Sequence, residues 1–198
     1  MPRPVSIPYH LETERLVLRC YDPEDAPAVF AAVNESRAFL MRYLPWPETA
    51  HLTLAASEAS MREKRGRYDL LQDLTMGMFH RADGRLVGGT GLHAVGHSVI
   101  DWDLGLLQIG YWLHVNETGN GYVTEAAREL TRFAFEDLGA EKVEIRAQPD
   151  NAPSRAVAER LGYQLEGVLR RVARQGGVMR DLAVYGMTRP DFLERPRG

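Results

Sequence analysis

The fold is decided by one stretch of the sequence, Ile109-Gly-Tyr-Trp-Leu-His-Val-Asn-Glu-Thr-Gly-Asn-Gly-Tyr-Val-Thr-Glu-Ala-Ala127. Its first part, up to Val115, has the β-branched, aromatic and apolar residues that favour a strand. The polar turn Gly119-Asn120-Gly121 follows. Apolar residues then recur at helical spacing, at Ala126, Ala127, Leu130, Phe133, Ala134 and Leu138. The stretch therefore predicts a strand, a tight Gly-x-Gly turn and an amphipathic helix that ends near Gly139.

A turn of this kind can bind an anion. The first turn of a helix has backbone N–H groups without an internal partner, and glycine lets the backbone approach a ligand closely. Phosphate suits such a site best, although the turn alone is equally compatible with a connection that only needs two flexible residues. Two phosphate motifs are excluded. The dinucleotide fingerprint requires glycine where Thr124 stands, and no Gly-Lys-Ser/Thr ending of a Walker loop occurs.

The pattern polar-x-x-Gly-x-Gly followed by Tyr-x-Thr-Glu-Ala closely resembles the acyl-coenzyme A loop of the GNAT superfamily of N-acetyltransferases. Within it, the closest resemblance is to the ribosomal-protein N-terminal (alanine/serine) acetyltransferase, RimJ/RimL-like, branch. The resemblance covers about residues 11–190, and Asn116 departs from the family's Gln or Arg. The supporting motifs, in the same order, are residues 13–19, Asn151-x-x-Ser154, Leu161-Gly162-Tyr163, Glu166-Gly167, and Arg180-Asp181 with Tyr185.

The rest of the chain predicts the order β-α-α-β-β-β-α-β-α-β-β. Strands are expected at 15–19, 74–80, 86–93, 142–147, 170–174 and 182–187. Helices are expected from Asp22-Pro23, over about 53–71, and after Asp150 or Asn151 as the cap. The fold class is therefore α/β (α+β), with a mixed, mostly antiparallel central sheet flanked by helices, and the resemblance implies the GNAT acyl-CoA N-acyltransferase fold. We expect an irregular arm over residues 1–12, one acetyltransferase domain over 13–190 and a tail over 191–198.

Bulk properties narrow the class of protein. A length of 198 residues suits one domain, and a net charge of −3 gives no electrostatic case for nucleic-acid binding. The single cysteine, Cys20, excludes an internal disulfide framework. No apolar run approaches the roughly 20 residues of a membrane span, and the N-terminus lacks the apolar segment of a signal peptide. A cytoplasmic location without a membrane partner is expected.

The resemblance implies acetyl-CoA as cosubstrate and no metal. The pyrophosphate is expected on the backbone N–H groups of the Gly-x-Gly turn. The pantetheine arm is expected beside the preceding strand, where a free N–H can polarise the thioester oxygen. The expected coenzyme contacts are Leu113, His114, Val115, Gly119, Asn120, Gly121, Tyr122, Asn151, Ser154 and Arg155.

Ser154 matches the position of the proton donor to the leaving sulfur in this branch. The structural alternative is a first-turn serine that bonds the helix backbone, as serine does well. Many superfamily members use a tyrosine in the following turn, but Ala158 stands there. Tyr163 and Tyr185 are alternative donors, or core aromatics.

The base is harder to assign. The branch often has a carboxylate just before Ile-Gly-Tyr, where this chain has Gln108, and a second acidic position falls on Ala173. The remaining candidates are Asp101, Glu166, His93 and Asp103, and a solvent-mediated or substrate-assisted route stays open. His93 and His97 do not share a helix face, which argues against zinc. Cys20 has no evident partner and reads as a buried small residue.

The sequence thus predicts an N-acetyltransferase that transfers an acetyl group from acetyl-CoA directly to a primary amine. The acceptor is a protein N-terminal α-amine or a small-molecule amine, and a homodimer is left open. The alternative is a non-catalytic acyl-CoA-binding module that keeps the loop and has lost the base.

Overall fold

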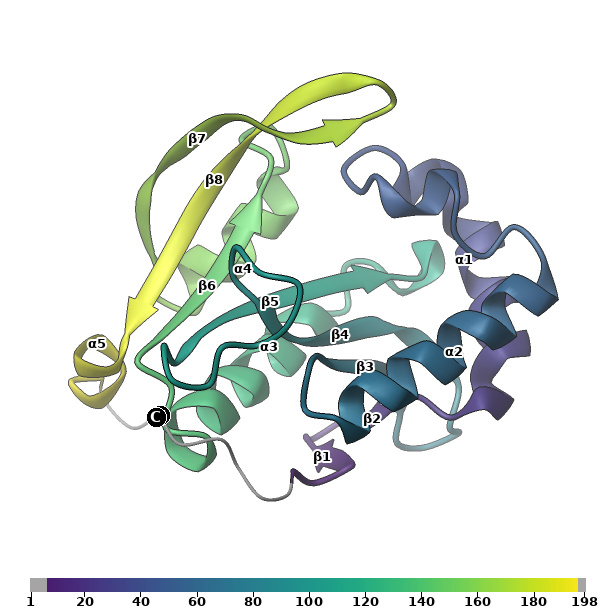
Figure 1. Cartoon of the computed structure of the whole chain (residues 1–198), viewed down its shortest axis with the longest axis horizontal. Helices are drawn as coiled ribbons and strands as arrows, with labels where there is room; N and C mark the ends of the chain where they lie inside the picture. The colour runs from purple at the N-terminus through teal and green to yellow at the C-terminus, as the bar shows by residue number, and fades with distance from the viewer. Residues whose placement is uncertain (1–6, 196–198) are drawn as a thin grey trace.

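An eight-stranded sheet runs through the molecule in the order β1-β2-β3-β4-β5-β6-β8-β7 (Figure 1). Every neighbouring pair is antiparallel except β5 and β6, so the sheet is mixed and mostly antiparallel, as predicted. The computed structural model describes residues 7–195. The strands are β1 (His10–Glu12), β2 (Leu16–Cys20), β3 (Leu74–His80), β4 (Leu86–Ala94), β5 (Leu106–Leu113), β6 (Lys142–Ala147), β7 (Gln164–Gln175) and β8 (Val178–Thr188).

Helices cover both faces of the sheet (Figure 1). They are α1 (Ala26–Leu40), α2 (Leu54–Asp69), α3 (Tyr122–Arg132), α4 (Ala152–Arg160) and α5 (Arg189–Leu193), and α3 continues as a π-helical turn over Phe133–Asp137. One core cluster joins α3 and α4 to the sheet, and a second joins α1 to Tyr21 and Phe79 with Trp112 packed against it. Successive residues of β5 therefore face different helices, since side chains alternate along a strand.

The predicted order holds, with differences at its ends. The arm expected over residues 1–12 includes a short strand, β1, which pairs with β2. The tail expected from residue 191 begins inside α5. The strand expected to reach Val115 ends at Leu113, because Val115–Glu117 forms a 3₁₀ turn. Residues 1–6 and 196–198 lie outside the described part of the chain.

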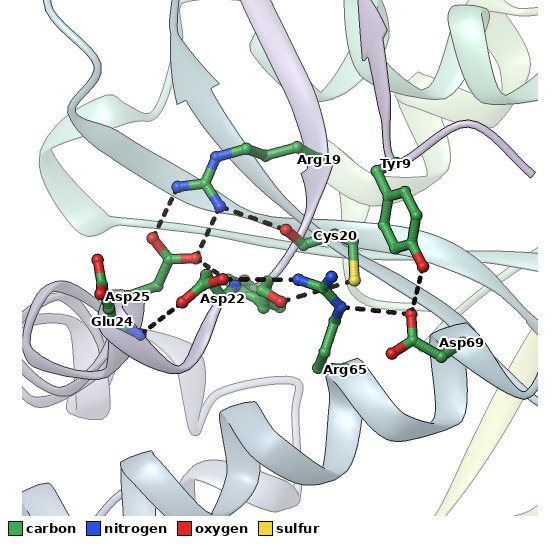
Figure 2. A network of polar contacts seen from close by, with 9 residues as sticks. Tyr9, Arg19, Cys20, Asp22, Glu24, Asp25, Arg65 and Asp69 are labelled. Carbon is green, nitrogen blue, oxygen red and sulfur yellow. Dashed lines mark hydrogen bonds and ion pairs between the residues drawn. The ribbon is translucent and has the colours of Figure 1, made fainter.

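A polar network fixes α1 and α2 to the first strands (Figure 2). Asp22 caps the turn before α1 through the Glu24 N–H, as the Asp-Pro pair predicts. Arg19 binds Asp25 through two hydrogen bonds of 2.8 and 2.7 Å. From α2, Arg65 contacts Asp22 at 3.5 Å and Asp69 at 3.3 Å. These contacts hold the two helices, and so the loop between them, on one face of the sheet.

Candidate active site

β5 and β6 lie side by side at one end and diverge at the other (Figure 1). Within the described residues their register runs from Leu106 opposite Lys142 to Ile109 opposite Ile145. On its other side β5 stays paired with β4, and the His114 N–H donates to the Val87 carbonyl at 3.0 Å. Alternate residues of an antiparallel strand direct their backbone polar groups to opposite sides. Tyr111 and Leu113 therefore direct theirs toward the opening between β5 and β6.

A cavity of about 1160 Å³ lies at this opening. Pockets for one drug-sized ligand span about 300–1,000 Å³, so this cavity has room for a larger ligand or two substrates. One part of its lining, here called the α3 end, consists of Glu14, Arg15, Thr118, Gly119, Gly121, Tyr122, Val123, Thr124, Glu125, Arg128 and Arg160. The other, here called the hairpin end, consists of Phe39, Leu40, Arg42, Tyr43, Arg146, Gln148, Ala173, Arg174, Gln175 and Leu182.

No side chain caps the amino end of α3 by a hydrogen bond. The residue before the helix, Gly121, has a φ of +79°. Gly119 has a φ of +82°, with open space where a Cβ would lie. Residues with a side chain rarely adopt such φ values, so both glycines are needed for this path. The predicted Gly-x-Gly turn therefore leaves the first N–H groups of α3 available to a ligand in the cavity.

Cationic side chains surround this helix end. Arg15 donates to the Asn120 carbonyl at 2.9 Å and forms an ion pair with Glu125 at 2.7 Å. Burial raises the pKa of Glu125, but hydrogen bonds from Thr13 and Arg15 outweigh burial and leave that pKa below its ordinary value. Arg160 donates to Thr124 at 3.0 Å. With Arg128 also in the lining, the α3 end attracts a multiply charged anion.

Ser154 lies in the first turn of α4, which Asn151 caps by accepting the Ser154 N–H at 3.3 Å. The Ser154 hydroxyl lies 2.8 Å from the hydroxyl of Tyr111, and either can donate. Burial raises the pKa of Tyr111 to about 12, against the opposing effect of the Ser154 hydrogen bond. Both residues line the cavity, so they place two protonated hydroxyls on its wall.

Four expected coenzyme contacts are not part of the lining, namely His114, Val115, Asn120 and Arg155. The amides of the first two are already occupied, since His114 N–H donates to Val87 and Val115 N–H to the Ser36 hydroxyl at 2.9 Å. Arg155 donates to the Tyr185 hydroxyl at 2.8 Å. The expected contacts that do line the cavity are Leu113, Gly119, Gly121, Tyr122, Asn151 and Ser154.

The alternative tyrosines also lie outside the lining. The Tyr163 hydroxyl is buried against Thr131 at 2.7 Å. The Tyr185 hydroxyl donates to Glu159 at 2.8 Å. Both are core aromatics with satisfied hydroxyls.

The two carboxylates expected as bases, Asp101 and Glu166, lie outside the cavity lining. Asp101 accepts the backbone N–H groups of Asp103 and Leu104, which closes a loop turn. Glu166 pairs with Lys142 at 2.6 Å. Each carboxylate is thus engaged in its own local structure, and neither is retained as a base.

His93 is placed differently. Its Nδ1 lies 2.9 Å from a carboxylate oxygen of Asp73. Burial raises the pKa of Asp73, but hydrogen bonds from His93 and Thr75 outweigh burial and lower that pKa overall. The other ring nitrogen, Nε2, lies 3.1 Å from the position that a Cβ would take on Gly110, a residue of the cavity wall. An imidazole oriented by a carboxylate on one nitrogen can accept a proton on the other.

Tyr111, Asp73 and the arginines of the hairpin end were not predicted as site residues from the sequence. Tyr111 belongs to the strand before the Gly-x-Gly turn. Because side chains alternate along β5, Tyr111 lies on the face of the sheet that carries α4, whereas Trp112 lies on the other face. The alternation of side chains along the predicted strand could therefore have identified Tyr111 as a residue on the α4 side. Asp73, Arg42 and Arg174 come from separate parts of the chain and carry no local pattern.

Three other features are absent from residues 7–195: a reactive cysteine, a metal site and a membrane-spanning helix. Burial raises the pKa of Cys20 to about 11, which keeps its thiol protonated. No three His, Cys, Asp or Glu side chains in this range are grouped to hold a metal ion. In the same range, no helix has both the length and the apolar character to span a bilayer.

This chain is similar to known acetyltransferases. A family model described as an acetyltransferase (GNAT) domain matches residues 15–164. The chain is 29% identical over 179 residues to "Putative ribosomal N-acetyltransferase YdaF" of Bacillus subtilis, covering 90% of this chain and 94% of the relative. It is 22% identical to the [ribosomal protein uS5]-alanine N-acetyltransferase of Escherichia coli, covering 92% of each. The solved structure of RimL, a ribosomal L7/L12 alpha-N-protein acetyltransferase in complex with coenzyme A, superposes with a TM-score of 0.83 at 20% identity, covering 92% of this chain and 99% of that one.

Proposed function

The chain belongs to the acetyltransferase (GNAT) domain family and is an acetyl-CoA-dependent N-acetyltransferase, and we propose that its acceptor is the α-amine of a polypeptide N-terminus. The observation that supports this function most is the uncapped amino end of α3, which opens into a large cavity where β5 and β6 diverge. A primary amine on a small molecule is the wider class of acceptor.

The α3 end fits the diphosphate of the coenzyme. The free N–H groups after Gly121 and the helix dipole favour an anion, and Arg128 and Arg160 add positive charge. The coenzyme, when bound, supplies the reactive thioester. The Leu113 backbone, turned toward the opening, is proposed to pair with the pantetheine arm and to donate its N–H to the thioester oxygen.

Ser154 and Tyr111 are proposed as the proton source. As the carbon–sulfur bond breaks, the leaving sulfur takes a proton, and Ser154 stands on the cavity wall with its hydroxyl bonded to Tyr111. Tyr111 then returns a proton to Ser154 and is itself reprotonated from water. The raised pKa of Tyr111 keeps this reserve protonated at neutral pH.

His93 is proposed as the base. A protonated amine must lose a proton before it attacks the thioester carbon. His93 is not itself a lining residue, but its Nε2 lies beside Gly110, which is one. This ring nitrogen makes no hydrogen bond within the described residues, whereas Asp101 and Glu166 are engaged in their own local structure. Asp73 holds the other ring nitrogen and stabilises the charged imidazole. One proton passes from the amine to Nε2 directly or through one water, and the neutral amine attacks the thioester carbon. As the carbon–sulfur bond breaks and the amide forms, the nitrogen gives its second proton to water, which balances the proton that the leaving sulfur takes up.

The peptide acceptor rests on the relatives and on the residues at the hairpin end. The names of YdaF and of the uS5-alanine enzyme refer to ribosomal N-acetylation and to an alanine acceptor on a ribosomal protein. Phe39, Tyr43 and Leu182 supply an apolar and aromatic surface beside polar Gln148 and Gln175, which suits the backbone and side chains of a peptide end. A cytoplasmic location, where unfinished and ribosomal polypeptides are found, belongs to the same proposal.

A homodimer is also proposed, through β7. This strand is the edge of the sheet, and it exposes Leu165, Val168, Leu169 and Val172. An edge strand with exposed apolar side chains can pair with its own copy about a two-fold axis. Sedimentation at two concentrations tests this, since a monomer at both would contradict it.

Thiol release tests the proposed function. Purified protein is incubated with acetyl-CoA and a panel of peptides and small amines, and free coenzyme thiol is measured. We expect release that depends on the amine and is fastest with peptide α-amines. Coenzyme binding without amine-dependent release across the panel would instead indicate a non-catalytic acyl-CoA-binding module.

A further inference from the structure

Three arginines lie at the hairpin end of the cavity, Arg42 after α1, Arg146 on β6 and Arg174 on β7. The carboxylates in the cavity lining are Glu14 and Glu125, and both belong to the α3 end. Within the described chain, the hairpin end is therefore lined by positive charge without a lining carboxylate. The coenzyme phosphates do not account for this charge, because the α3 end has its own arginines.

Arg146 is held in a fixed orientation. Its Nε and one terminal nitrogen contact a carboxylate oxygen of Glu144 at 2.9 and 2.8 Å. Glu144 is almost fully buried and also binds Lys142 at 3.0 Å, and Lys142 in turn pairs with Glu166 at 2.6 Å, so the charges of these four side chains balance. The position of Arg146 is one residue past the last β5–β6 pair, where the two strands separate. Arg146 therefore lines the cavity next to the point where the strands diverge.

Arg42 and Arg174 face the same gap from two different elements. In Figure 1 the tip of the β7–β8 hairpin reaches toward the segment after α1. Gln175 donates to the Met41 carbonyl, and Gln148 donates to Gln175 and, at 3.0 Å, to the Tyr43 carbonyl. These bonds bring the neighbours of Arg42 and Arg174 together.

Neither the Arg42 nor the Arg174 guanidinium is paired with a carboxylate of the described residues. Arg174 donates to the Gly177 carbonyl at 3.3 Å, which leaves its charge without a carboxylate. The Arg42 side chain makes no hydrogen bond or ion pair with any described residue; only its backbone N–H is bonded, to the Phe39 carbonyl at 3.3 Å. Both side chains are exposed at the mouth of the hairpin end.

We infer that this enzyme selects acceptors that carry an anionic group, a carboxylate or a phosphate, within a few bonds of the amine to be acetylated. Arginine guanidinium binds such oxyanions through paired N–H donors. An anionic group on the acceptor meets Arg42 and Arg174 at the mouth. The charge of Arg146, by contrast, is already balanced by Glu144. An acceptor with positive charge at the mouth is repelled. This inference rests on the proposed N-acetyltransferase function and names the acceptor class of the same site.

Matched acceptors test it. Three tetrapeptide amides share an N-terminal serine and differ only at positions two and three, which are alanine, aspartate or lysine. Free glutamate and its diamide form a second pair, which separates a small amino acid from a peptide as the source of the anion. We expect kcat/KM for the aspartate peptide to exceed that for the alanine peptide by at least tenfold, with the lysine peptide lowest. A similar advantage of glutamate over its diamide would identify free amino acids as acceptors too.

Variants connect the preference to the arginines. The double variant Arg42→Gln with Arg174→Gln is expected to reduce the aspartate-to-alanine ratio to below threefold. Arg170→Gln, on the same strand but outside the cavity lining, is the matched control and is expected to keep the wild-type ratio. Equal kcat/KM for the three peptides, or a ratio unchanged in the double variant, would overturn the inference. The proposed function itself fails under a different result, namely no coenzyme binding and no thiol release with any amine.

Discussion

The hydroxyl of Ser154 lies 2.8 Å from the hydroxyl of Tyr111, which joins the first turn of α4 to β5 on the cavity wall. Tyr111 also donates to the Ser154 carbonyl at 3.2 Å, so the two side chains are fixed relative to one another. A hydroxyl that gives its proton to a leaving thiolate must recover one, and a bonded neighbour can return it. The donor role that the sequence suggested for one residue is therefore proposed for a pair.

Removing the Ser154 hydroxyl should slow the chemical step. We expect Ser154→Ala to lower kcat by about 10²-fold, the lower range for general acid catalysis, with little change in the dissociation constant of coenzyme A. Tyr111→Phe should lower kcat by a smaller factor, because Ser154 remains. The control is Tyr163→Phe, which removes a buried hydroxyl outside the cavity and should keep kcat. A Ser154→Ala enzyme with wild-type kcat would remove this pair from the mechanism.

The proposed base predicts a change in pH dependence. His93→Gln should lower kcat/KM by about 10²-fold and remove the rise of kcat/KM with pH on the acidic side, because the group that must lose its proton is gone. Asp73→Asn should give an intermediate loss, since it leaves the imidazole without its oriented carboxylate. His97→Gln, in an exposed loop, is the control. If the acid side of the profile persists in His93→Gln, the base is elsewhere.

Gly121→Val should weaken coenzyme binding by at least about tenfold, or 1.4 kcal/mol. The φ of +79° at this position is strained for a β-branched residue, so the turn must rearrange at the amino end of α3. Gly84→Val is a matched control, because Gly84 also has a positive φ, of +69°, but lies in the β3–β4 turn away from the cavity. Calorimetric titration with coenzyme A measures both. Equal affinity in the two variants would separate the turn from coenzyme binding.

Folding stability should depend on His51. Burial, with a smaller effect of Lys64 and Arg37, lowers the pKa of this imidazole to about 4, whereas an unfolded histidine titrates near 6.5. Between about pH 6.5 and 4 the unfolded chain therefore binds a proton that the native state does not, and the free energy of unfolding falls as pH falls through this window.

Asparagine is the informative replacement for His51, because it tolerates the positive φ of 55° found there and does not titrate. Urea unfolding at pH 7 and pH 5 should show a smaller drop in stability for His51→Asn than for the wild type. The same drop in both proteins would contradict the assignment.

Local sequence patterns were enough for most of the fold. β3 and β6 have the predicted bounds, because each is a short run of strand-forming residues between turn residues. β1 was not predicted, since three residues become a strand only through pairing with β2. The early end of β5 depends on the bond from the Val115 amide to Ser36, a residue distant in the chain.

The residues of the candidate site also divide into those set by local sequence and those set by contacts between distant parts of the chain. The coenzyme turn was predictable, because the glycines, the following helix and the anion site lie within a dozen residues. The base was not, because His93 becomes a candidate only when β3 and β4 bring Asp73 to one of its nitrogens and β5 brings Gly110 to the other. Asp101 and Glu166 have suitable chemistry, but their partners in space direct them to structural roles.

The central claim is that the free amides at the amino end of α3 hold the diphosphate of acetyl-CoA. The most direct test is to follow the backbone ¹⁵N–¹H resonances of Gly121, Tyr122 and Val123 while acetyl-CoA is added to saturation. The account predicts large shifts at these amides, as expected for new hydrogen bonds to an anion, and unchanged resonances at Gly84 and Gly176. Saturable coenzyme binding that leaves the three α3 amides unchanged would contradict it.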